Sequence, residues 1–367
     1  MTPRWHLPGH QRWLAECAGH LAGGASVVAH LPPHAPARPE HALREHLGRC
    51  LGLEWREIDA DAAIPIAPLH LLAERFCDRR GDEAGGLPSL LASGGLDGKL
   101  LCLRALRSDS WRPWSRFLLD LEQAAQQRPA AERVRFLALL PANVPVGFAP
   151  QPRLAVLPWR GIVGPSEVRA WVDDHLAGRQ LGSVERALVR EVAASLAGWD
   201  LDLACRLAEL DLADLLAPAR IAARLEPALQ LQGGASSTWE AGLLDQQDGS
   251  PVVHLRWLFA IGDHDAIRRR IWRGQLSVLF PLLEEIRHLL VRDAAPFLGA
   301  PADAGGGLDD LEIGQIHHQL LAHGRTPPRL REASGVLREI RNRLAHGEVV
   351  PATQALHRAV REYRRRL

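Results

Sequence analysis

The stretch VRFLALL (residues 134–140) is a short and almost continuous apolar run, and it is one of five candidate strands in the first 165 residues. The other four are ASVVAHL (25–31), residues 55–60, LLCLRAL (100–106) and LAVLPW (154–159), and several of these are also nearly continuous in apolar residues. Runs of this kind, bounded by Gly or Pro, are typical of strands that a parallel sheet buries on both faces. Helical patterns lie between them, at residues 39–51 and 114–127. Residues 1–165 therefore predict an α/β domain with a mostly parallel sheet.

The pattern becomes helical after residue 165, where strand-like runs nearly disappear. We expect an all-α middle region over 166–231 that resembles a lid, with helices at 166–177, 183–197 and 201–216. A Gly-, Ser- and Gln-rich stretch at 232–250 predicts a linker. Residues 251–367 predict a C-terminal helical bundle. It contains an amphipathic helix interrupted or kinked at Pro281, a helix at 311–323, and a helix that begins near Thr326-Pro327-Pro328 and ends at His346.

The composition limits the class of protein. A chain of 367 residues exceeds one ordinary hydrophobic core, and its 47% hydrophobic content contains no run long enough for a membrane helix. Residues 1–6 lack the pattern of a signal peptide, and the five cysteines are scattered. We therefore expect a cytoplasmic protein of at least two domains, with no membrane association and no disulfide framework.

Lysine is almost absent from the chain. Only Lys99 occurs among 44 basic residues, and the net charge is +1. Arginine keeps its proton at any working pH, whereas lysine can serve as an amine nucleophile or as a compact phosphate ligand. Any mechanism that needs a lysine must therefore use Lys99.

The segment EIRNRLAHG (residues 339–347) carries the most chemistry. On a helix, Leu337, Ile340 and Leu344 form one apolar stripe. The opposite arc holds Arg338, Glu339, Arg341, Asn342 and His346. Histidine can move a proton at neutral pH, arginine can stabilise charge on phosphorus, and asparagine can orient a substrate or an imidazole. This set suits phosphodiester cleavage without a metal.

The residues Arg341-Asn342-(three residues)-His346, late in a helical bundle, resemble the Rx4-6H motif of the HEPN superfamily. That resemblance implies a metal-independent endoribonuclease of an antiphage, CRISPR-associated or toxin-type system, which cleaves RNA by attack of the 2′-hydroxyl. It implies catalysis by Arg341 and His346, support from Asn342, and a homodimer formed through the C-terminal bundle. No cofactor and no metal are expected. The alternative is a noncatalytic HEPN-fold adaptor or dimerisation protein that regulates a defence complex.

A second group of residues is a candidate for RNA binding. Its members are basic or aromatic and precede or flank the motif: Arg268, Arg269, Arg270, Trp272, Arg273 and Arg338. Arginine can hold phosphates, and an indole can stack on a base. The alternative for residues 268–273 is a solvated helix face. The terminal Arg364-Arg365-Arg366 is either a phosphate contact or a frayed tail.

The first domain resembles the P-loop ATPase core of AAA-like or STAND-like proteins, with residues 25–31 as the first strand. That fold needs a glycine-rich loop with a lysine after the first strand, but this chain has LPPHAPARP at 31–39. Lys99 precedes an apolar strand and cannot replace the missing lysine. We expect a degenerate domain that does not hydrolyse ATP and that contacts a protein partner. A ligand-sensing Rossmann-like domain is the alternative.

Three histidines and a glutamate near the motif, Glu312, His317, His318 and His323, suggest a metal site at first sight. The adjacent pair cannot point the same way on a helix, and no cysteine accompanies them. We therefore expect a solvated helix face here.

Overall fold

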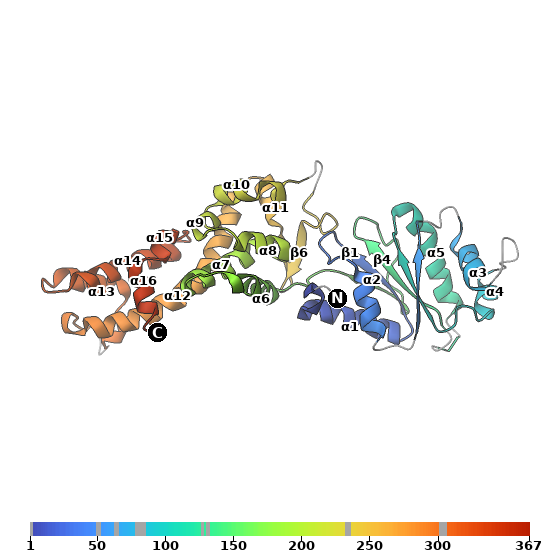
Figure 1. Cartoon of the computed structure of the whole chain (residues 1–367), viewed down its shortest axis with the longest axis horizontal. Coiled ribbons are helices and arrows are strands. Elements are labelled where there is room, and N and C mark those ends of the chain that lie inside the picture. The colour runs from blue at the N-terminus through green and yellow to red at the C-terminus, as the bar shows by residue number, and fades with distance from the viewer. Residues whose placement is uncertain are drawn as a thin grey trace. The chain divides into compact units, whose positions relative to one another are not determined.

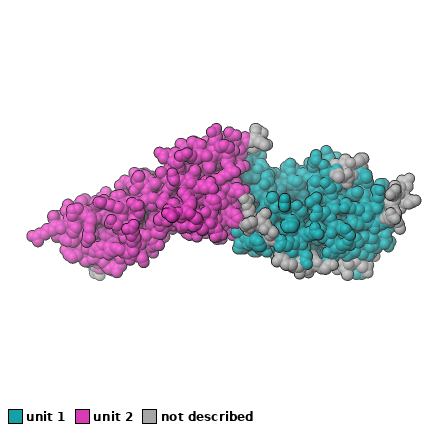
Figure 2. Space-filling model, in the orientation of Figure 1, with its two compact units in different colours: residues 1–164, 236–252 teal, residues 165–235, 253–367 magenta. Residues whose placement is uncertain are grey.

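The computed structural model describes residues 3–48, 53–61, 66–77, 86–125, 128–129, 133–231, 236–300 and 307–367. The chain divides into two compact units, which Figure 2 shows in different colours. Unit 1 comprises residues 1–164 and 236–252, and unit 2 comprises residues 165–235 and 253–367.

Unit 1 is built on a five-stranded sheet in which every neighbouring pair of strands is parallel. The strand order is β2-β3-β4-β1-β5. Figure 1 shows the adjacent strands β1 and β4 of this sheet. The strands are β1 (Ser26–Leu31), β2 (Glu54–Asp59), β3 (Lys99–Arg104), β4 (Arg135–Pro141) and β5 (Leu154–Pro158). This confirms the predicted α/β fold with a parallel sheet. Each strand lies within two residues of its predicted position.

Helices cover both faces of this sheet because alternate strand residues point to opposite sides. Val27 and Ala29 of β1 pack in one core with helices α1 (Pro8–Ala22) and α2 (Pro39–Gly48). Val28 packs in the other core. The helices on that side are α3 (Pro68–Cys77), α4 (Leu87–Ala92) and α5 (Ser108–Ala124).

The described part of the predicted linker is not a linker. Residues 236–252 belong to unit 1, and they contain most of a two-stranded sheet of β6 (Leu244–Gln247) and β7 (Ser250–Val253). Trp239 is 3% exposed and donates its indole N–H to the carbonyl oxygen of Trp159, at 2.9 Å. Burial of this indole fixes the segment to unit 1, because the hydrophobic effect opposes its release. Residues 232–235 lie outside the described residues.

The segment also covers the loop that follows β1. The Trp239 ring meets the His30 ring edge-on, with centroids 5.0 Å apart. Asp245 accepts a hydrogen bond from the Gly161 N–H at 2.9 Å and lies 3.4 Å from the His34 imidazole. The loop where a P-loop protein would hold phosphate therefore contacts the chain's own later residues.

Unit 2 is almost entirely helical. Its helices are α6 (Pro165–His175), α7 (Ser183–Ala197), α8 (Leu201–Ala208), α9 (Leu212–Leu215), α10 (Pro218–Leu229), α11 (Leu255–Ala260), α12 (His264–Ala294), α13 (Ile313–Ala322), α14 (Pro328–Ala345), α15 (Ala352–Ala355) and α16 (Arg358–Arg364). The single helix predicted at 201–216 is two helices, α8 and α9. Short 3₁₀ turns precede α1 and follow α6, and others occur at Ala295–Phe297 and Leu308–Asp310.

Helix α12 organises unit 2. It runs through Pro281 as one helix of 31 residues and packs against both α7 and α14. At Gly274 the approach to α7 is so close that an added Cβ would lie 2.8 Å from the Cα of Val192. The predicted middle region and the predicted C-terminal bundle therefore form one unit. Among the described residues, no helix combines the length and apolar character that crossing a membrane requires.

Candidate active site

The motif helix, α14, follows from its sequence pattern. Leu330, Ala333, Leu337, Ile340 and Leu344 recur at three- and four-residue intervals and are buried, with at most 2% of each exposed. Pro327 is the N-cap, and Pro328 begins the first turn, where its missing N–H costs nothing. The apolar face of α14 packs inside unit 2, and the opposite face of the helix is directed to solvent.

The helix ends in a Schellman motif around His346. Gly347 has φ +75°, the left-handed conformation that glycine adopts without a steric penalty. The Gly347 N–H donates to the carbonyl oxygen of Leu344 at 3.2 Å, and the Glu348 N–H donates to that of Arg343 at 2.9 Å. His346 is therefore the C-cap residue, and its side chain leaves the helix at a defined turn.

A groove of about 380 Å³ lies along the solvent face of this helix. Its lining residues are Gly335, Arg338, Glu339, Asn342, Arg343, His346 and Glu348. Arg338, Asn342 and His346 are spaced by four residues, so they follow one another along a single row of the helix. The structure thus brings the predicted Asn342, His346 and Arg338 into one site.

The three side chains of this row are free to meet a ligand. His346 and Arg338 are exposed and Asn342 is half-buried. Within the described part of the chain, none of the three side chains forms a hydrogen bond or an ion pair with another residue. Polar side chains that a protein leaves unpaired in a groove can bind an outside partner without first breaking internal contacts.

The two carboxylates at the groove are already occupied. Arg343 lies 3.7 Å from a Glu339 oxygen and 3.3 Å from a Glu348 oxygen. Glu339 also accepts a hydrogen bond from the Gln354 amide at 2.5 Å. Arg343 thus offsets the acidic side chains, and Arg338 is left as a cation without an ion pair among the described residues.

Arg341 does not line the groove. Five residues at 100° each place it about 140° around the helix from His346. Its guanidinium pairs instead with Glu312, the residue before α13, at 3.4 Å, and its side chain is 42% exposed. The sequence predicts Arg341, Asn342 and His346 on one arc of the helix. Within one chain, it is Arg338 and not Arg341 that lines the groove beside Asn342 and His346.

Two of the predicted RNA-binding residues on α12 have internal partners instead. Arg270 donates hydrogen bonds to the carbonyl oxygens of Leu196 and Val253. Burial, with a smaller contribution from the charge of Arg273, lowers the pKa of Arg270 to about 10. The half-buried Trp272 donates its indole N–H to the carbonyl oxygen of Leu344 at 2.8 Å. Both side chains therefore have a structural role within unit 2, and RNA binding by either of them stays a prediction.

The other three predicted RNA-binding arginines of α12 are at the surface. Arg268 pairs with Asp265, whereas Arg269 and Arg273 are exposed and form no ion pair with a described residue. Arg269 and Arg273 are one helical turn apart, so they share a side of α12. They remain available to a polyanion.

Sequence reasoning missed Gln275. This residue is fully buried, at 0% exposure, and forms two reciprocal hydrogen bonds with Val350. Its amide nitrogen donates to the Val350 carbonyl at 2.6 Å, and its amide oxygen accepts from the Val350 N–H at 2.8 Å. The signal was a polar residue between Ile271 and Leu279 on the apolar stripe of α12, where only a paired polar group is tolerated.

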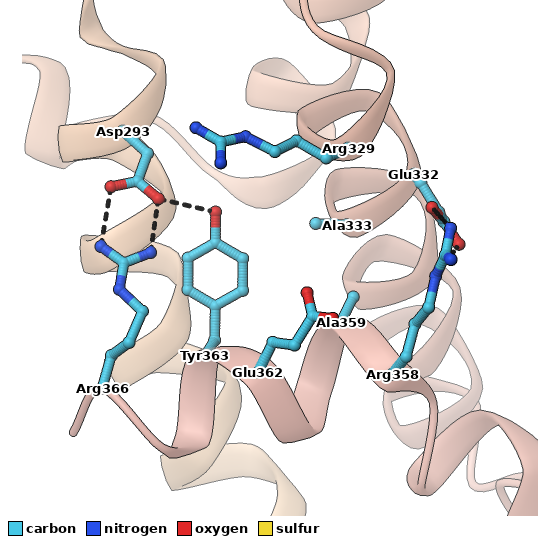
Figure 3. A pocket seen from close by; sticks show the side chains of 9 residues that line it. All are labelled: Asp293, Arg329, Glu332, Ala333, Arg358, Ala359, Glu362, Tyr363 and Arg366. Carbon is cyan, nitrogen blue, oxygen red and sulfur yellow. Dashed lines mark hydrogen bonds and ion pairs between the residues drawn. The ribbon is translucent and has the colours of Figure 1, made fainter.

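A second cavity, of about 360 Å³, lies between α12, α14 and α16 (Figure 3). Figure 3 shows a bidentate ion pair between two nitrogens of Arg366 and the Asp293 carboxylate. The Tyr363 hydroxyl donates to the same carboxylate. Arg358 pairs in the same bidentate way with Glu332. Three arginines and three carboxylates line this cavity, so its formal charges balance. Two of the three guanidinium groups are already held by carboxylates, and the cavity offers no concentrated charge to a ligand.

Of the two histidines of α13, His317 packs against α14 and His318 is exposed. His317 bonds to the Ser334 hydroxyl at 2.9 Å, and its ring fills the space beside Gly335. Burial and the charge of Arg338 lower its pKa. In the described residues, no three His, Cys, Asp or Glu side chains converge in a way that could hold a metal ion.

No protein-family model matches this chain. No curated protein matches it either.

Proposed function

We propose that unit 2 is a metal-independent endoribonuclease of the HEPN type, acting as the effector of a bacterial antiphage defence or toxin-type system. The observation that carries the proposal is the row of Arg338, Asn342 and His346 in one groove, each without an internal partner among the described residues. The Rx4-6H resemblance at Arg341 and His346 supports it.

In this mechanism His346 takes the proton from a ribose 2′-hydroxyl. The 2′-oxygen attacks the adjacent phosphorus, the bond to the 5′-oxygen breaks, and that oxygen receives a proton. The products are a 2′,3′-cyclic phosphate and a 5′-hydroxyl. Arg338 stabilises the charge on the phosphate. Asn342 orients the imidazole or the substrate, since it lies one helical turn from both Arg338 and His346.

Arg341 acts in the active protein as part of a homodimer. It lies on the flank of α14, outside its own groove, and its ion pair with Glu312 is exposed and therefore weak. A second copy that approaches this flank can present its Arg341 to the first copy's groove. The proposal thus assigns one arginine to each side of the phosphate.

The test is cleavage of total RNA in EDTA by the full chain and its variants. We expect His346→Ala to lose activity at least 100-fold, because general acid–base catalysis contributes about 10²–10⁴-fold. Arg338→Ala, Arg341→Ala and Asn342→Ala should each lose roughly 10-fold or more, since removal of one group that stabilises developing charge costs that much or more. His318→Ala, which changes an exposed histidine of α13, is the matched control. Equal cleavage by all variants, or cleavage by none including the wild type, contradicts the proposal.

Mixing two impaired variants tests the dimer. If each site combines Arg341 of one copy with His346 of the other, a heterodimer of Arg341→Ala and His346→Ala contains one intact site. The mixture should then cleave RNA faster than either variant alone. No recovery, after exchange of subunits is verified by mass spectrometry, argues that both residues act within one chain.

A noncatalytic adaptor is the second candidate, and the Arg341–Glu312 ion pair favours it, because that contact occupies the motif arginine. This candidate predicts a stable dimer without RNA cleavage.

For unit 1 the proposal is a degenerate P-loop ATPase-like domain that binds a protein partner. The contacts of His30 and His34 with residues 239–245 support the loss of nucleotide binding, since they fill the end of β1 with the chain's own side chains.

A further inference from the structure

His346 has no side-chain partner among the described residues, so the backbone alone sets its position. The helix end around it is exposed from Ala345 to Glu348. Exposed helix ends fray unless their last carbonyls and the following residues are held. The contacts that hold this backbone therefore decide where the imidazole lies.

Two side chains of α12 supply those contacts, one on each side of His346. The Trp272 indole donates to the carbonyl oxygen of Leu344, two residues before His346. Gln275 forms its reciprocal pair with Val350, four residues after His346. Val350 is itself fully buried. The turn that carries the histidine is thus held at both ends by α12.

The part of α12 that bears these residues is itself held firmly. Gly274 lies between them and packs directly on the backbone of α7. Close-packed helices shift only at a cost, because interiors have few voids. Among the described residues, the buried Gln275 amide bonds only to Val350, and an unpaired buried amide costs roughly 1–3 kcal/mol. The two hydrogen-bonding side chains therefore link a closely packed helix pair to the exposed end of the motif helix.

We infer that Trp272 and Gln275 are positioning residues for the proposed RNA cleavage, which hold the His346 imidazole in its catalytic place from outside the motif. The inference rests on the proposed function. Neither residue touches the substrate; both act through the backbone at Leu344 and Val350.

Trp272→Phe and Gln275→Met test this. Gln275→Met keeps the size of the side chain and removes its hydrogen bonds, whereas Trp272→Phe removes the indole N–H together with one ring. The control is Trp257→Phe, which removes the indole N–H of another half-buried tryptophan of unit 2 that bonds to no described residue. We expect kcat to fall about 10-fold for Trp272→Phe and about 30-fold for Gln275→Met, since small misplacements of a catalytic group can cost up to 10²-fold. KM should change less than twofold, and Trp257→Phe should match the wild type.

Amide hydrogen exchange across residues 344–350 is the second readout, and it does not depend on activity. Both variants should exchange at least 10-fold faster there, at a temperature where circular dichroism shows every variant folded. Unchanged exchange overturns the inference, and so does faster exchange with an unchanged kcat. If the wild type cleaves no RNA, the proposed function fails and the catalytic role fails with it. The exchange data then still show whether the two side chains hold the helix end.

Discussion

The arginine side chains of unit 2 differ in what their guanidinium groups contact. The half-buried Arg270 donates to two backbone carbonyls, Arg343 lies between two carboxylates, and Arg338 forms no ion pair with a described residue. A guanidinium bonded to backbone carbonyls stabilises the fold, and one between carboxylates offsets their charge. Only the third kind is ready for an anionic ligand. Sequence spacing alone cannot separate these environments, because all three residues occur in similar helical patterns.

The buried pair of Asp200 and His254 gives the clearest pH dependence. The Nε2 of His254 lies 3.1 Å from an Asp200 oxygen, and Asp200 also caps α8 through the Leu203 N–H. Burial opposes ionisation of Asp200, but the hydrogen bond and the charge of His254 outweigh it and lower its pKa to about 2. An acid whose pKa is lower in the folded state stabilises that state above its ordinary pKa of 3.8.

We predict that this contribution, about 2 kcal/mol, is lost as the pH falls from about 4 to 2. Asp200→Asn keeps an oxygen that can cap α8 but removes the charge that faces His254. The variant should unfold at lower denaturant at pH 7 and show a smaller loss of stability between pH 4 and 2. Urea titrations at several pH values measure both effects. Parallel pH curves for the variant and the wild type would contradict the assignment.

At the scale of elements, the chain's last helix is attached rather than frayed. Arg366 grips Asp293 with two nitrogens, and Tyr363 donates to the same carboxylate at 3.1 Å (Figure 3). Arg364 lies 3.6 Å from Glu285. The hydrogen bond from Arg366 is the main cause that lowers the pKa of Asp293, although burial opposes it. The frayed tail considered for residues 364–366 is therefore replaced by a helix fixed to α12.

Arg366→Ala should lower the melting temperature of the full chain by about 2–4 °C. This corresponds to a bidentate but partly exposed ion pair worth about 1 kcal/mol. Arg361→Ala, which removes an exposed arginine of α16 without an ion pair among the described residues, is the control and should have no effect. The difference between Arg366→Ala and the wild type should shrink as acid protonates Asp293. Calorimetry at neutral and acid pH checks this, and a constant difference would contradict the role of the carboxylate.

Most of the sheet could be predicted from the sequence because its three central strands are apolar on both faces. The runs at β1, β3 and β4 admit few other structures. The hairpin of β6 and β7 was missed because its strands are short and polar. Its signal was Asp248-Gly249, where both residues have positive φ, as a two-residue turn requires.

The candidate site was predictable only in part. The pattern around α14 predicts the exposed row that contains Asn342 and His346. Two features of the site could not be predicted from that pattern: the ion pair of Arg341 with Glu312 and the hydrogen bonds from α12. Both join residues far apart in the chain, and helical periodicity carries no information on such contacts.

At the scale of the whole molecule, the loop after β1 is the place where the proposed P-loop resemblance of unit 1 would require a phosphate site. A phosphate loop presents successive backbone N–H groups and a lysine, whereas Pro32, Pro33 and Pro36 have no N–H to donate. His34 in this loop lies against Asp245, so an anion placed there would face a carboxylate. The chemistry of the loop is thus unsuited to a triphosphate.

We predict that millimolar ATP with Mg²⁺ leaves the melting temperature of the protein unchanged. Ligand at 100 times its Kd would stabilise the unit that binds it by about 2.7 kcal/mol, which corresponds to a rise of several degrees. Differential scanning fluorimetry measures this directly. A rise of that size would show a nucleotide site of a nonstandard kind.

The return of residues 236–252 to unit 1 has a consequence for how the protein is made. The chain leaves unit 1 after residue 164, comes back at 236 and departs again after 252, so it crosses between the units three times. During synthesis from the N-terminus, the sheet is complete long before Trp239 emerges from the ribosome. Unit 1 must therefore wait for the first helices of unit 2 to be translated before its last core tryptophan can be buried. A gene fragment cut at residue 164 would encode a sheet that lacks this tryptophan and leaves the surface beneath it exposed.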